Sequence, residues 1–285
     1  EIASCLVGSE MCIRDRYHEM HSLTGQSALV TGASAGIGRA VAVALAEAGA
    51  DVAVNYHGSR DGAEETVEMV RALGRRTVAI RADVASQADV KAMFDTAEQA
   101  LGPLDIVVSN AGRQKDAAVG DMTLDDWNAV VSTNLTGAFL VGREAILRFR
   151  RKGLRPDVSR ALGKLIFNSS VHERIPWAFR VNYAASKGGL KLLMESLAQE
   201  VSQERIRVNS VGPGAIATDI NRAERDKDGG EEAMLKLIPY KRIGDPEDVG
   251  RATAWLASDA SDYVVGHTLF VDGGMTLYPE FRGGG

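Results

Sequence analysis

The sequence predicts a single α/β domain built on a doubly wound parallel sheet of about seven strands, with helices on both faces. From Ser27 onward, short apolar runs rich in β-branched residues alternate with longer segments of helical periodicity. Several runs, such as VAVNY and IVVSN, are nearly continuously apolar, as expected of parallel strands buried on both faces. No repeat or low-complexity linker interrupts the alternation, so we expect residues 20–285 to form one domain.

Apolar runs and periodicity place seven strands and six helices along the chain. The segment 38–50 is expected to be helical because Val41, Leu45 and Ala48 recur at helical spacing before Gly49, a common helix terminator. The expected strands are 27–32, 51–56, 77–84, 104–112, 164–170, 206–214 and 267–274. The other expected helices are 61–73, 86–101, 123–151, 181–203 and 245–258.

Composition is that of an ordinary soluble globule, with 45% hydrophobic and 25% charged residues in 285. A net charge of −5 gives no basic field for nucleic acid or for an anionic membrane surface. No apolar run reaches the roughly 18 to 20 residues of a membrane-spanning helix. The two cysteines, Cys5 and Cys12, cannot organise a disulfide framework or a metal cluster in the rest of the chain. We therefore expect a cytoplasmic protein without a metal.

Two segments stand apart from this pattern. Residues 1–19 contain SCLVGSEMCIRDR, which lacks the features of a secretory signal and looks like a translated cloning adapter. Met20 then reads as the natural start, and we expect the leader to be disordered. A basic cluster is expected to form a solvated surface loop. Its members are Arg148, Arg150, Arg151, Lys152, Arg155 and Arg160.

The strand expected at 27–32 leads directly into the glycine-rich segment TGASAGIG and then into a helix. Gly32 permits a tight turn, Gly36 lets backbone approach a phosphate, and Gly38 lets helix and sheet pack closely. Helix N-terminal amides would face the negative charge. The segment therefore predicts a dinucleotide pyrophosphate site, the alternative being a tight turn that binds nothing.

Tyr183 and Lys187 form the sequence Y-A-A-S-K within an expected helix, which places them on one face about one turn apart. A phenol has a pKa near ~10 and is a poor base at neutral pH unless a nearby cation favours its anion. Lys187 would supply that charge. Tyr183 would then exchange a proton with a substrate hydroxyl while a nicotinamide exchanges the hydride.

The TGxxxGxG spacing and the Y-x-x-x-K pair together resemble the short-chain dehydrogenase/reductase family. The resemblance implies that Ser170, thirteen positions before Tyr183, is preferred to Ser169 as the catalytic serine, and that Asn134 completes a catalytic tetrad. It also implies a cofactor site in which Asp83 and Val84 contact adenine, although Asp83 has an equal alternative as a helix cap. Further cofactor residues implied are Ser34 and Ile37 in the glycine loop, Asn110, Ala111 and Gly112, and Pro213, Gly214, Ile216 and Thr218 near the nicotinamide. Taken singly, each tetrad residue has a structural explanation; it is their joint occurrence with the glycine loop that favours catalysis.

The end of the second expected strand bears on the choice between NAD and NADP. An acidic residue there would bind the ribose 2′-hydroxyl and repel a 2′-phosphate. Tyr56 and His57 occupy these places, with Arg60 nearby, so we expect NADP or NAD to be used. His57 has an alternative as a surface loop histidine.

Within the family, SVHERIPW and GGMTLYPEF look most like the bacterial glucose 1-dehydrogenases. That likeness implies oxidation of C1 of D-glucose to gluconolactone, with His172 and Asn221 beside Ser170 and Tyr183 as substrate contacts, or else as capping groups. Arg113, Gln114 and Lys115 depart from the glutamate that similar enzymes carry after NAG.

Two further features complete the expectations. The segment 221–234 is expected to be a mobile lid, and the C-terminal part resembles the region through which these enzymes form homotetramers. Alternative functions are a 3-oxoacyl thioester or small-ketone reductase on the same fold, and a non-catalytic dinucleotide sensor.

Overall fold

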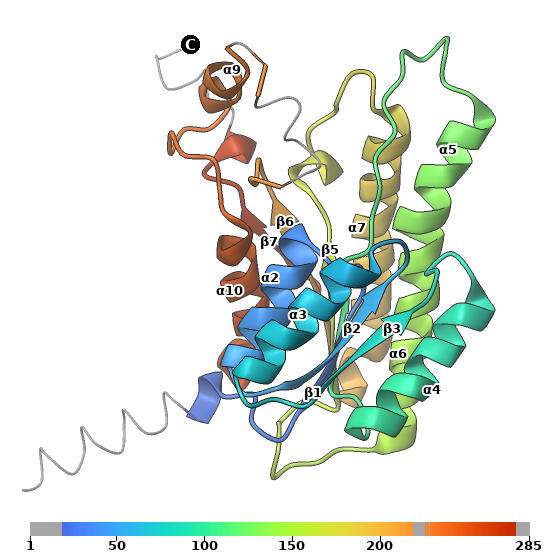
Figure 1. The fold of residues 1–285 in the computed structure, drawn as a ribbon, viewed down its shortest axis with the longest axis vertical. Coiled ribbons are helices and arrows are strands. Elements are labelled where there is room, and N and C mark those ends of the chain that lie inside the picture. Colours follow the sequence, from blue (N-terminus) through green and yellow to red (C-terminus); the bar gives the residue numbers. More distant parts are fainter. Residues whose placement is uncertain (1–18, 219–225, 228, 278–285) are drawn as a thin grey trace, which may run out of the picture.

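Seven parallel strands form one sheet in the order β3-β2-β1-β4-β5-β6-β7 (Figure 1). The computed structural model describes residues 19–218, 226–227 and 229–277. The strands are β1 (Ser27–Val30), β2 (Asp51–Tyr56), β3 (Thr77–Arg81), β4 (Ile106–Ser109), β5 (Gly163–Asn168), β6 (Ile206–Pro213) and β7 (Thr268–Val271). All six neighbouring pairs are parallel, so the predicted doubly wound sheet is confirmed.

The strand order reverses between β1 and β4, and the carboxyl ends of all strands meet at one edge. In open α/β sheets, ligands bind in the crevice outside this edge at the reversal point. The fold therefore directs attention to the segments that follow β1, β4 and β5.

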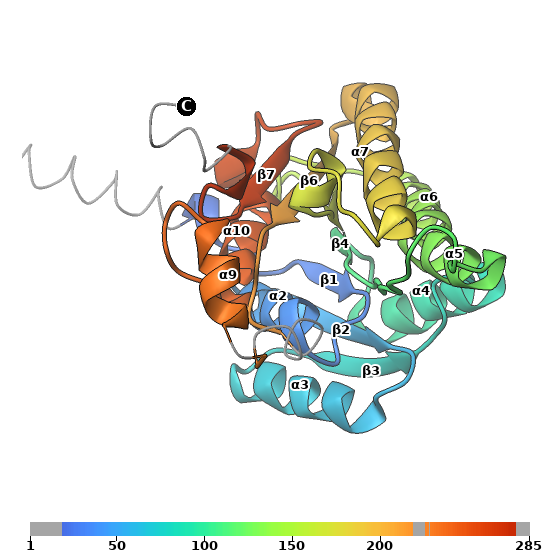
Figure 2. The same ribbon diagram turned by 90° about the horizontal axis from the view of Figure 1, so that it is seen from above.

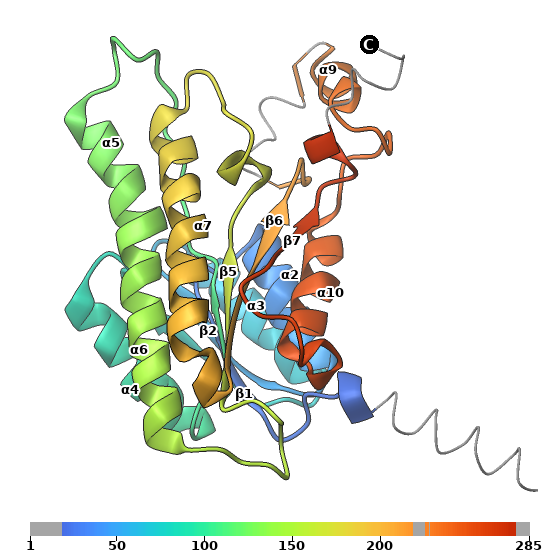
Figure 3. The same cartoon turned by 180° about the vertical axis from the view of Figure 1, so that it is seen from behind.

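Helices cover both faces of the sheet, as Figures 2 and 3 show. One layer holds α2 (Gly36–Glu47), α3 (Arg60–Ala72) and α10 (Pro246–Ala257); the other holds α4 (Gln87–Leu101), α5 (Leu124–Val131), α6 (Gly137–Lys152) and α7 (Val181–Val201). Successive β1 side chains alternate between two cores: Leu29 packs with α4, α6 and α7, whereas Ala28 and Val30 pack with α2, α3 and α10. This two-sided burial explains why the strands are so apolar in sequence.

Polar side chains start several helices at the predicted boundaries. Ser59 caps α3 and Ser86 caps α4, each accepting a backbone N–H from the first turn. Thr123 and Asp126 form a reciprocal capping box at α5. These caps satisfy amides that a helix leaves without partners, so each helix begins at a defined residue.

The helix predicted at 123–151 contains a turn of π-helix, η1 (Ser132–Thr136), between α5 and α6. A π turn inserts one residue and rotates the helix that follows. Hydrophobic periodicity does not reveal such an insertion, so the prediction of a regular helix was wrong at this point. A short helix α9 (Gly230–Lys236) was also not predicted, because its segment is polar.

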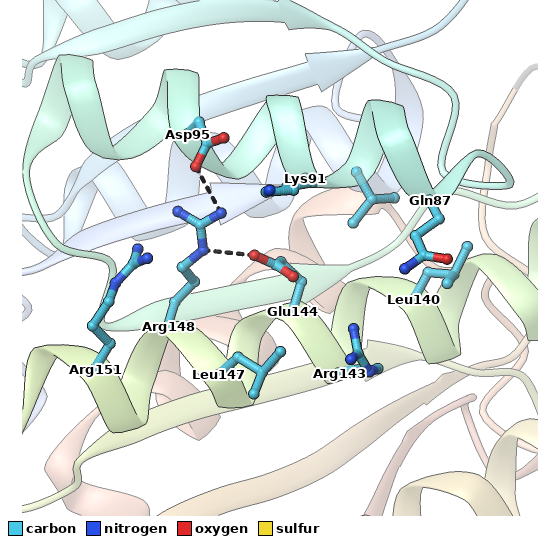
Figure 4. A pocket seen from close by; sticks show the side chains of 10 residues that line it. Gln87, Lys91, Asp95, Leu140, Arg143, Glu144, Leu147, Arg148 and Arg151 are labelled. Atoms are coloured by element: carbon cyan, nitrogen blue, oxygen red, sulfur yellow. Dashed lines mark hydrogen bonds and ion pairs between the residues drawn. The ribbon is translucent and has the colours of Figure 1, made fainter.

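The basic cluster is only in part the solvated loop that the sequence predicted: Arg151 and Arg160 are 63% and 64% exposed, whereas Arg148 and Lys152 are buried. Helix α6 continues through Lys152, and Arg148 has a side chain only 4% exposed. Arg148 bonds Asp95 and Glu144, as Figure 4 shows, and also Glu98. Burial alone would lower the pKa of Arg148, but these three carboxylates together raise it. The expectation was wrong because helix α4 supplies acidic partners that charge counting along the chain cannot see.

Lys152 and Arg155 hold a second buried ion cluster at the amino-terminal edge of the sheet. Both bond Asp105, which directly precedes β4, at 2.6 and 2.5 Å. The side chains of Lys152 and Asp105 are 4% and 5% exposed. The segment before β5 is therefore anchored to the sheet by charge, a role that the sequence did not suggest.

Several expectations concern residues that the structure leaves out in whole or part. The leader predicted at 1–19 lies outside the described residues except for Glu19. Across the described residues, no helix combines the length and apolarity needed to cross a bilayer. The same residues contain no cluster of three or more His, Cys, Asp or Glu side chains placed to hold a metal.

Candidate active site

The glycine-rich turn after β1 directs backbone amides toward the crevice. Gly32 and Gly36 have φ angles of 62° and 53°, in the left-handed region that strains other residues. Ala35, the residue before α2, has no side chain that can cap the helix. Free amides at a helix N-terminus attract phosphate groups. The turn thus has the geometry of an anion-binding loop.

Gly38 has no room for a side chain. A Cβ atom there would lie 2.2 Å from the carbonyl oxygen of Gly32 and 2.4 Å from Nδ2 of Asn110. Beside it, the predicted cofactor residues Ser34 and Ile37 are half-buried. At Gly38 the first turn of α2 lies directly against the turn that follows β1. This close approach sets the shape of the glycine-rich loop.

A hydrogen-bonded frame holds the loop against the ends of β2 and β4. Oγ1 of Thr31 accepts the backbone N–H groups of Asn110 and Ala111 at 2.9 and 3.0 Å. Nδ2 of Asn110 donates to the carbonyls of Thr31 and Gly32. Oδ1 of Asn55 accepts the N–H of Gly32 at 3.1 Å. The sequence analysis predicted Asn110 and Ala111 but missed Thr31 and Asn55. Each of the two missed residues is a polar residue in or just after an apolar strand. Such a residue needs a hydrogen-bond partner when it is buried, and this could have drawn attention to both.

The two residues at the end of β2 have different surroundings. The ring of Tyr56 is buried in the core, 9% exposed. His57 is exposed, and its carbonyl accepts Nε of Arg81 at 3.4 Å. Arg60 is exposed and pairs with Glu64. Only His57 and Arg60 of the predicted set therefore present side chains to a ribose phosphate.

Asp83 and Val84 follow β3 at the same edge. Oδ1 of Asp83 accepts the N–H of Ala85 at 2.9 Å, and the residue that caps α4 is Ser86. Asp83 is therefore not the helix cap that the alternative interpretation supposed. Val84 is buried, and a Cβ on Gly137 would lie 2.9 Å from it.

The segment after β6 lies against the glycine loop. Pro213 ends β6, and the N–H of Gly214 bonds the carbonyl of Val271 at 3.0 Å. Ile216 is buried and forms a bridge with Gly244. The methyl group of Thr218 lies 3.4 Å from where a Cβ on Gly36 would be. The predicted nicotinamide segment and phosphate loop are thus brought together.

The predicted catalytic groups meet between the end of β5 and the first turns of α7. Tyr183 and Ser170 form a side-chain hydrogen bond, and Oγ of Ser170 also accepts the N–H of His172 at 3.1 Å. Nζ of Lys187 lies 5.6 Å from the centre of the Tyr183 ring. The ammonium donates to the carbonyl of Asn168 at 2.7 Å. A hydroxyl, a phenol and an ammonium therefore share one small volume.

The structure separates the two serines that compete in the sequence. Oγ of Ser169 donates to Oε2 of Glu173 at 2.6 Å. Ser170 instead bonds Tyr183. Adjacent side chains of an extended segment point in opposite directions, which accounts for the difference. The geometry thus places Ser170, and not Ser169, at the phenol.

Burial is the main cause of the pKa shifts of Tyr183 and Lys187. It raises the pKa of Tyr183, and the hydrogen bond with Ser170 only partly opposes that rise. Burial also lowers the pKa of Lys187 to about 8, against the negative charge of Glu173, which raises it. Although we expected Lys187 to lower the pKa of Tyr183, the net shift is upward because burial dominates. At neutral pH the phenol keeps its proton, while Lys187 titrates close to the physiological range.

Asn134 lies in the π turn and fastens the loop that follows β4. Its Oδ1 accepts the N–H of Arg113 at 2.9 Å, and its Nδ2 donates to the carbonyl of Arg113 and to Oγ of Ser186. Gly112 lies beside it, where a Cβ would be 3.5 Å from Oδ1. Asn134 thus connects the loop after β4 to the helix of Tyr183.

His172 and Trp177 form a stacked aromatic pair next to the phenol of Tyr183, which we call the aromatic wall. The rings of His172 and Trp177 stack at 3.9 Å, and Trp177 meets Tyr183 edge to face at 6.1 Å. The guanidinium of Arg180 covers Trp177 at 4.0 Å. Nδ1 of His172 contacts the carbonyl of Ile175, and burial lowers the pKa of His172. The sequence analysis identified His172 but missed Trp177 and Arg180. The available signal was an aromatic residue, Trp177, a few positions before the expected catalytic tyrosine.

A buried amide supports the wall from the loop side. Asn182 is fully buried, and its Nδ2 donates to the carbonyls of Lys115 and Asp126 at 3.0 and 3.3 Å. Sequence reasoning missed Asn182. The predicted substrate contact Asn221 lies outside the described residues, and the expected lid 221–234 is described only at 226–227 and from 229 onward.

Two surface pockets lie away from the catalytic group. One, of about 360 Å³, lies between α4 and α6 and includes Arg148, Glu144 and Asp95 (Figure 4). Another, of about 450 Å³, lies along α2 and reaches Thr218 and Gly36. Neither contains Tyr183, so their size gives no guide to the chemistry.

Comparison with known proteins agrees with this geometry. A family model described as enoyl-(acyl carrier protein) reductase matches residues 32–276. Glucose 1-dehydrogenase 2 of Bacillus subtilis (strain 168) is 42% identical over 259 residues, which cover 90% of this chain and 97% of the relative. 3beta-hydroxysteroid dehydrogenase 1 of Eggerthella lenta is also 42% identical, over 92% of this chain and 98% of the relative.

A solved structure shares the fold closely. The gluconate 5-dehydrogenase of Burkholderia cenocepacia J2315, determined in complex with NADP and tartrate, superposes with a TM-score of 0.84 at 34% identity. The match covers 92% of this chain and 99% of that one. The relatives thus share one architecture while acting on different substrates.

Proposed function

Because this chain belongs to the short-chain dehydrogenase/reductase family, we propose that it is an NAD(P)-dependent dehydrogenase that oxidises the C1 hydroxyl of a pyranose such as D-glucose to a lactone. The observation that carries the proposal is the meeting of Ser170, Tyr183 and Lys187 at the sheet edge that also bears the glycine loop. This is where a reacting carbinol has to lie between a proton acceptor and a nicotinamide.

Each residue has a distinct part in the reaction. Ser170 and Tyr183 hold the substrate oxygen, and Tyr183, after its own proton has passed to solvent, takes the hydroxyl proton. A nicotinamide held at this edge would supply the hydride acceptor for the same carbon. Lys187 stabilises the phenolate by its charge, and its hydrogen bond to Asn168 fixes the direction of the ammonium. In the reducing direction Tyr183 returns the proton.

Dual use of NADP and NAD fits the end of β2. No acidic side chain stands at positions 56 and 57, and His57 is exposed there with Arg60 nearby. A cationic or neutral edge accepts the 2′-phosphate that an acid would repel. The gluconate 5-dehydrogenase with the same fold binds NADP, which supports this choice.

The sugar substrate is supported by one relative and one surface. The Bacillus relative at 42% identity is named for glucose. The imidazole of His172, stacked on Trp177 and beside Tyr183, gives an aromatic surface on which the C–H face of a pyranose can pack. Polar ring atoms of His172 lie within the same wall for a sugar hydroxyl.

A second candidate is the reduction of 3-oxoacyl thioesters or small ketones. The 3-oxoacyl-[acyl-carrier-protein] reductase FabG of Staphylococcus aureus is 40% identical to this chain over 252 residues, which favours it. The same proton and hydride transfers would run in reverse, because the catalytic groups do not fix the substrate. The two candidate functions differ only in the substrate that the enzyme accepts.

A substrate panel tests the proposal. The purified protein is assayed with NAD and NADP against glucose, galactose, gluconate and a 3β-hydroxysteroid, and with NADH and NADPH against acetoacetyl thioesters, following the reduced cofactor by absorbance. We expect glucose to give the highest kcat/KM, and Tyr183→Phe to lower kcat about 10²- to 10⁴-fold. Reduction of the thioester without sugar oxidation would select the second candidate. Nucleotide binding with no turnover on any substrate would favour a dinucleotide sensor.

A homotetramer in the cytoplasm is part of the same proposal. Large apolar side chains are exposed on two sides of the subunit, Phe139 and Leu147 on α6, and Tyr263 and Val265 before β7. Apolar surface of this kind favours contact between subunits. Light scattering of the eluted protein should give four times the subunit mass, and a monomer mass would contradict it.

A further inference from the structure

Glu173 joins two strands that are not neighbours in the sheet. It ends the short helix η2 (Val171–Glu173), three residues after Ser170. Its Oε2 accepts Oγ of Ser169 at 2.6 Å, just after β5, and Oγ1 of Thr268 at 3.3 Å, the first residue of β7. Thr268 in turn bonds Oγ of Ser210 on the intervening β6 at 2.6 Å. One carboxylate thus connects three strands beneath the catalytic group.

These contacts fix the backbone that carries Ser170. The N–H of Ser169 bonds the carbonyl of Val211, and the N–H of Glu173 bonds the carbonyl of Ser170. With Ser169 held toward Glu173, Ser170 must point to the opposite side, where Tyr183 lies. The position of the Ser170 hydroxyl therefore depends on Glu173.

The other carboxylate oxygen of Glu173, Oε1, has different surroundings. Oε1 of Glu173 is buried and has no hydrogen-bond partner among the described residues. A buried carboxylate needs an opposite charge nearby to offset its desolvation. The charge of Glu173 acts on Lys187 and opposes the effect of burial on its pKa. The cation on which this charge acts is the ammonium of Lys187.

Other elements packed against Lys187 bring little charge. On its own helix the titratable neighbour is Tyr183, and η2 adds His172, whose pKa burial lowers. The end of β5 presents the neutral carbonyl of Asn168, and the π turn η1 is neutral throughout. Helix α5 carries Asp126, which bonds its own cap Thr123. Among these groups, Glu173 is the anion whose charge raises the pKa of Lys187 against burial.

We propose that Glu173 is a positioning residue of the catalytic centre: it holds the strand end that presents Ser170 and supplies the negative charge opposite Lys187. The proposal rests on the dehydrogenase function above and adds a residue that makes no contact with substrate. Two effects of one side chain, a hydrogen bond and a charge, can be separated by two variants.

Glu173→Gln keeps the size and an acceptor oxygen but removes the charge. Ser169→Ala removes the hydrogen bond but keeps the charge. Glu200→Gln removes an exposed carboxylate from the far end of α7 and is the matched control. The titration of Lys187 is followed by NMR in protein labelled with carbon-13 at the lysine ε position, the signal being assigned with Lys187→Met. Binding of NADP and turnover of glucose are measured in parallel.

In the wild type we expect Lys187 to titrate with a pKa of about 8. Glu173→Gln should lower that pKa by about one unit and reduce kcat about fivefold at pH 8, because fewer molecules then hold the ammonium. Ser169→Ala should lower kcat without moving the titration, and Glu200→Gln should change neither. The dissociation constant of NADP should stay constant in all three.

Identical Lys187 titrations in Glu173→Gln and wild type would overturn the proposal. So would a loss of thermal stability in Glu173→Gln and Ser169→Ala with unchanged titration and kcat, since that pattern describes a structural role. If the wild type does not oxidise glucose, the proposed function fails, yet the Lys187 titration still reports on Glu173. The two failures are therefore distinguishable.

Discussion

The ammonium of Lys187 donates a hydrogen bond to the carbonyl of Asn168, 2.7 Å away, and so ties α7 to the last residue of β5. The side-chain amide of Asn168 in turn donates to Oδ1 of Asn110, also at 2.7 Å. Asn110 holds the glycine loop through Thr31 and Gly32. A continuous chain of hydrogen bonds thus links the predicted catalytic groups to the glycine-rich loop. Substitutions at different points of this chain should affect catalysis and cofactor binding separately.

Gly38→Ala should disrupt cofactor binding. The new Cβ would lie 2.2 Å from the carbonyl oxygen of Gly32, so the loop has to move. We expect the dissociation constant of NADP, measured by fluorescence, to rise at least about tenfold, or 1.4 kcal/mol. Gly120→Ala is the control, because no atom lies within 4 Å of its Cβ position. Equal affinities in both variants would contradict a phosphate loop at Gly38.

His57→Asp should shift coenzyme use toward NAD. A carboxylate at this exposed strand end can bind the ribose 2′-hydroxyl and repels a 2′-phosphate. We expect KM for NADP to rise about tenfold while KM for NAD changes little, a difference of about 1.4 kcal/mol. His57→Asn, which is neutral, should show a smaller change. A parallel rise for both coenzymes would place the 2′-position elsewhere.

Lys164→Met should flatten the dependence of stability on pH. Lys164 is 1% exposed, and burial lowers its pKa from 10.5 to about 7. Between these values the unfolded chain binds more protons at this site than the folded protein, so the free energy of unfolding rises with pH, by up to about 1.4 kcal/mol per unit. The variant should lose that slope.

Urea unfolding at intervals from pH 7 to pH 9.5 measures this effect. Lys91→Met, which replaces an exposed lysine on α4, should keep the slope of the wild type. Equal slopes in Lys164→Met and the wild type would show that Lys164 is not neutralised by folding.

Arg148→Met should destabilise the fold although it lies far from the chemistry. Removal of this 4% exposed side chain leaves Glu144, 15% exposed, without its cation, and leaves Glu98, 18% exposed, with Arg151 alone. Loss of one partner from a buried pair costs about 3 kcal/mol or more. Arg151→Met changes an arginine that is 63% exposed and should cost at most about 1 kcal/mol. Thermal unfolding of both variants provides the comparison, and similar losses would argue against burial as the cause.

Local sequence patterns predicted the sheet well because strands and helices leave local signatures. All seven strands form where apolar, β-branched runs predicted them, and Gly32 and Gly36 adopt the left-handed angles that the turn requires. The π turn around Asn134 escaped prediction, since one inserted residue barely disturbs helical periodicity. Strand ends were overextended, as at 77–84, where β3 stops at Arg81.

Side-chain environments were harder to predict because they depend on distant segments. The burial of Arg148 needs acids from α4, and that of Tyr56 needs the packing of α3. Asn55 and Glu173 looked ordinary in sequence, and only the sheet brings each to its partners. The pair Tyr183 and Lys187 could be predicted because the two residues lie four positions apart on one helix, so their proximity does not depend on distant segments.

The ion pairs of Asp105 and the buried Lys164 lie where strands begin, whereas Ser170 and the glycine loop lie where strands end. The six residues of β5 separate these two sets by about 20 Å. Heat resistance can therefore be selected by changing the charged residues at the start of the strands, with dehydrogenase activity as an independent check that the opposite edge of the sheet has not been disturbed.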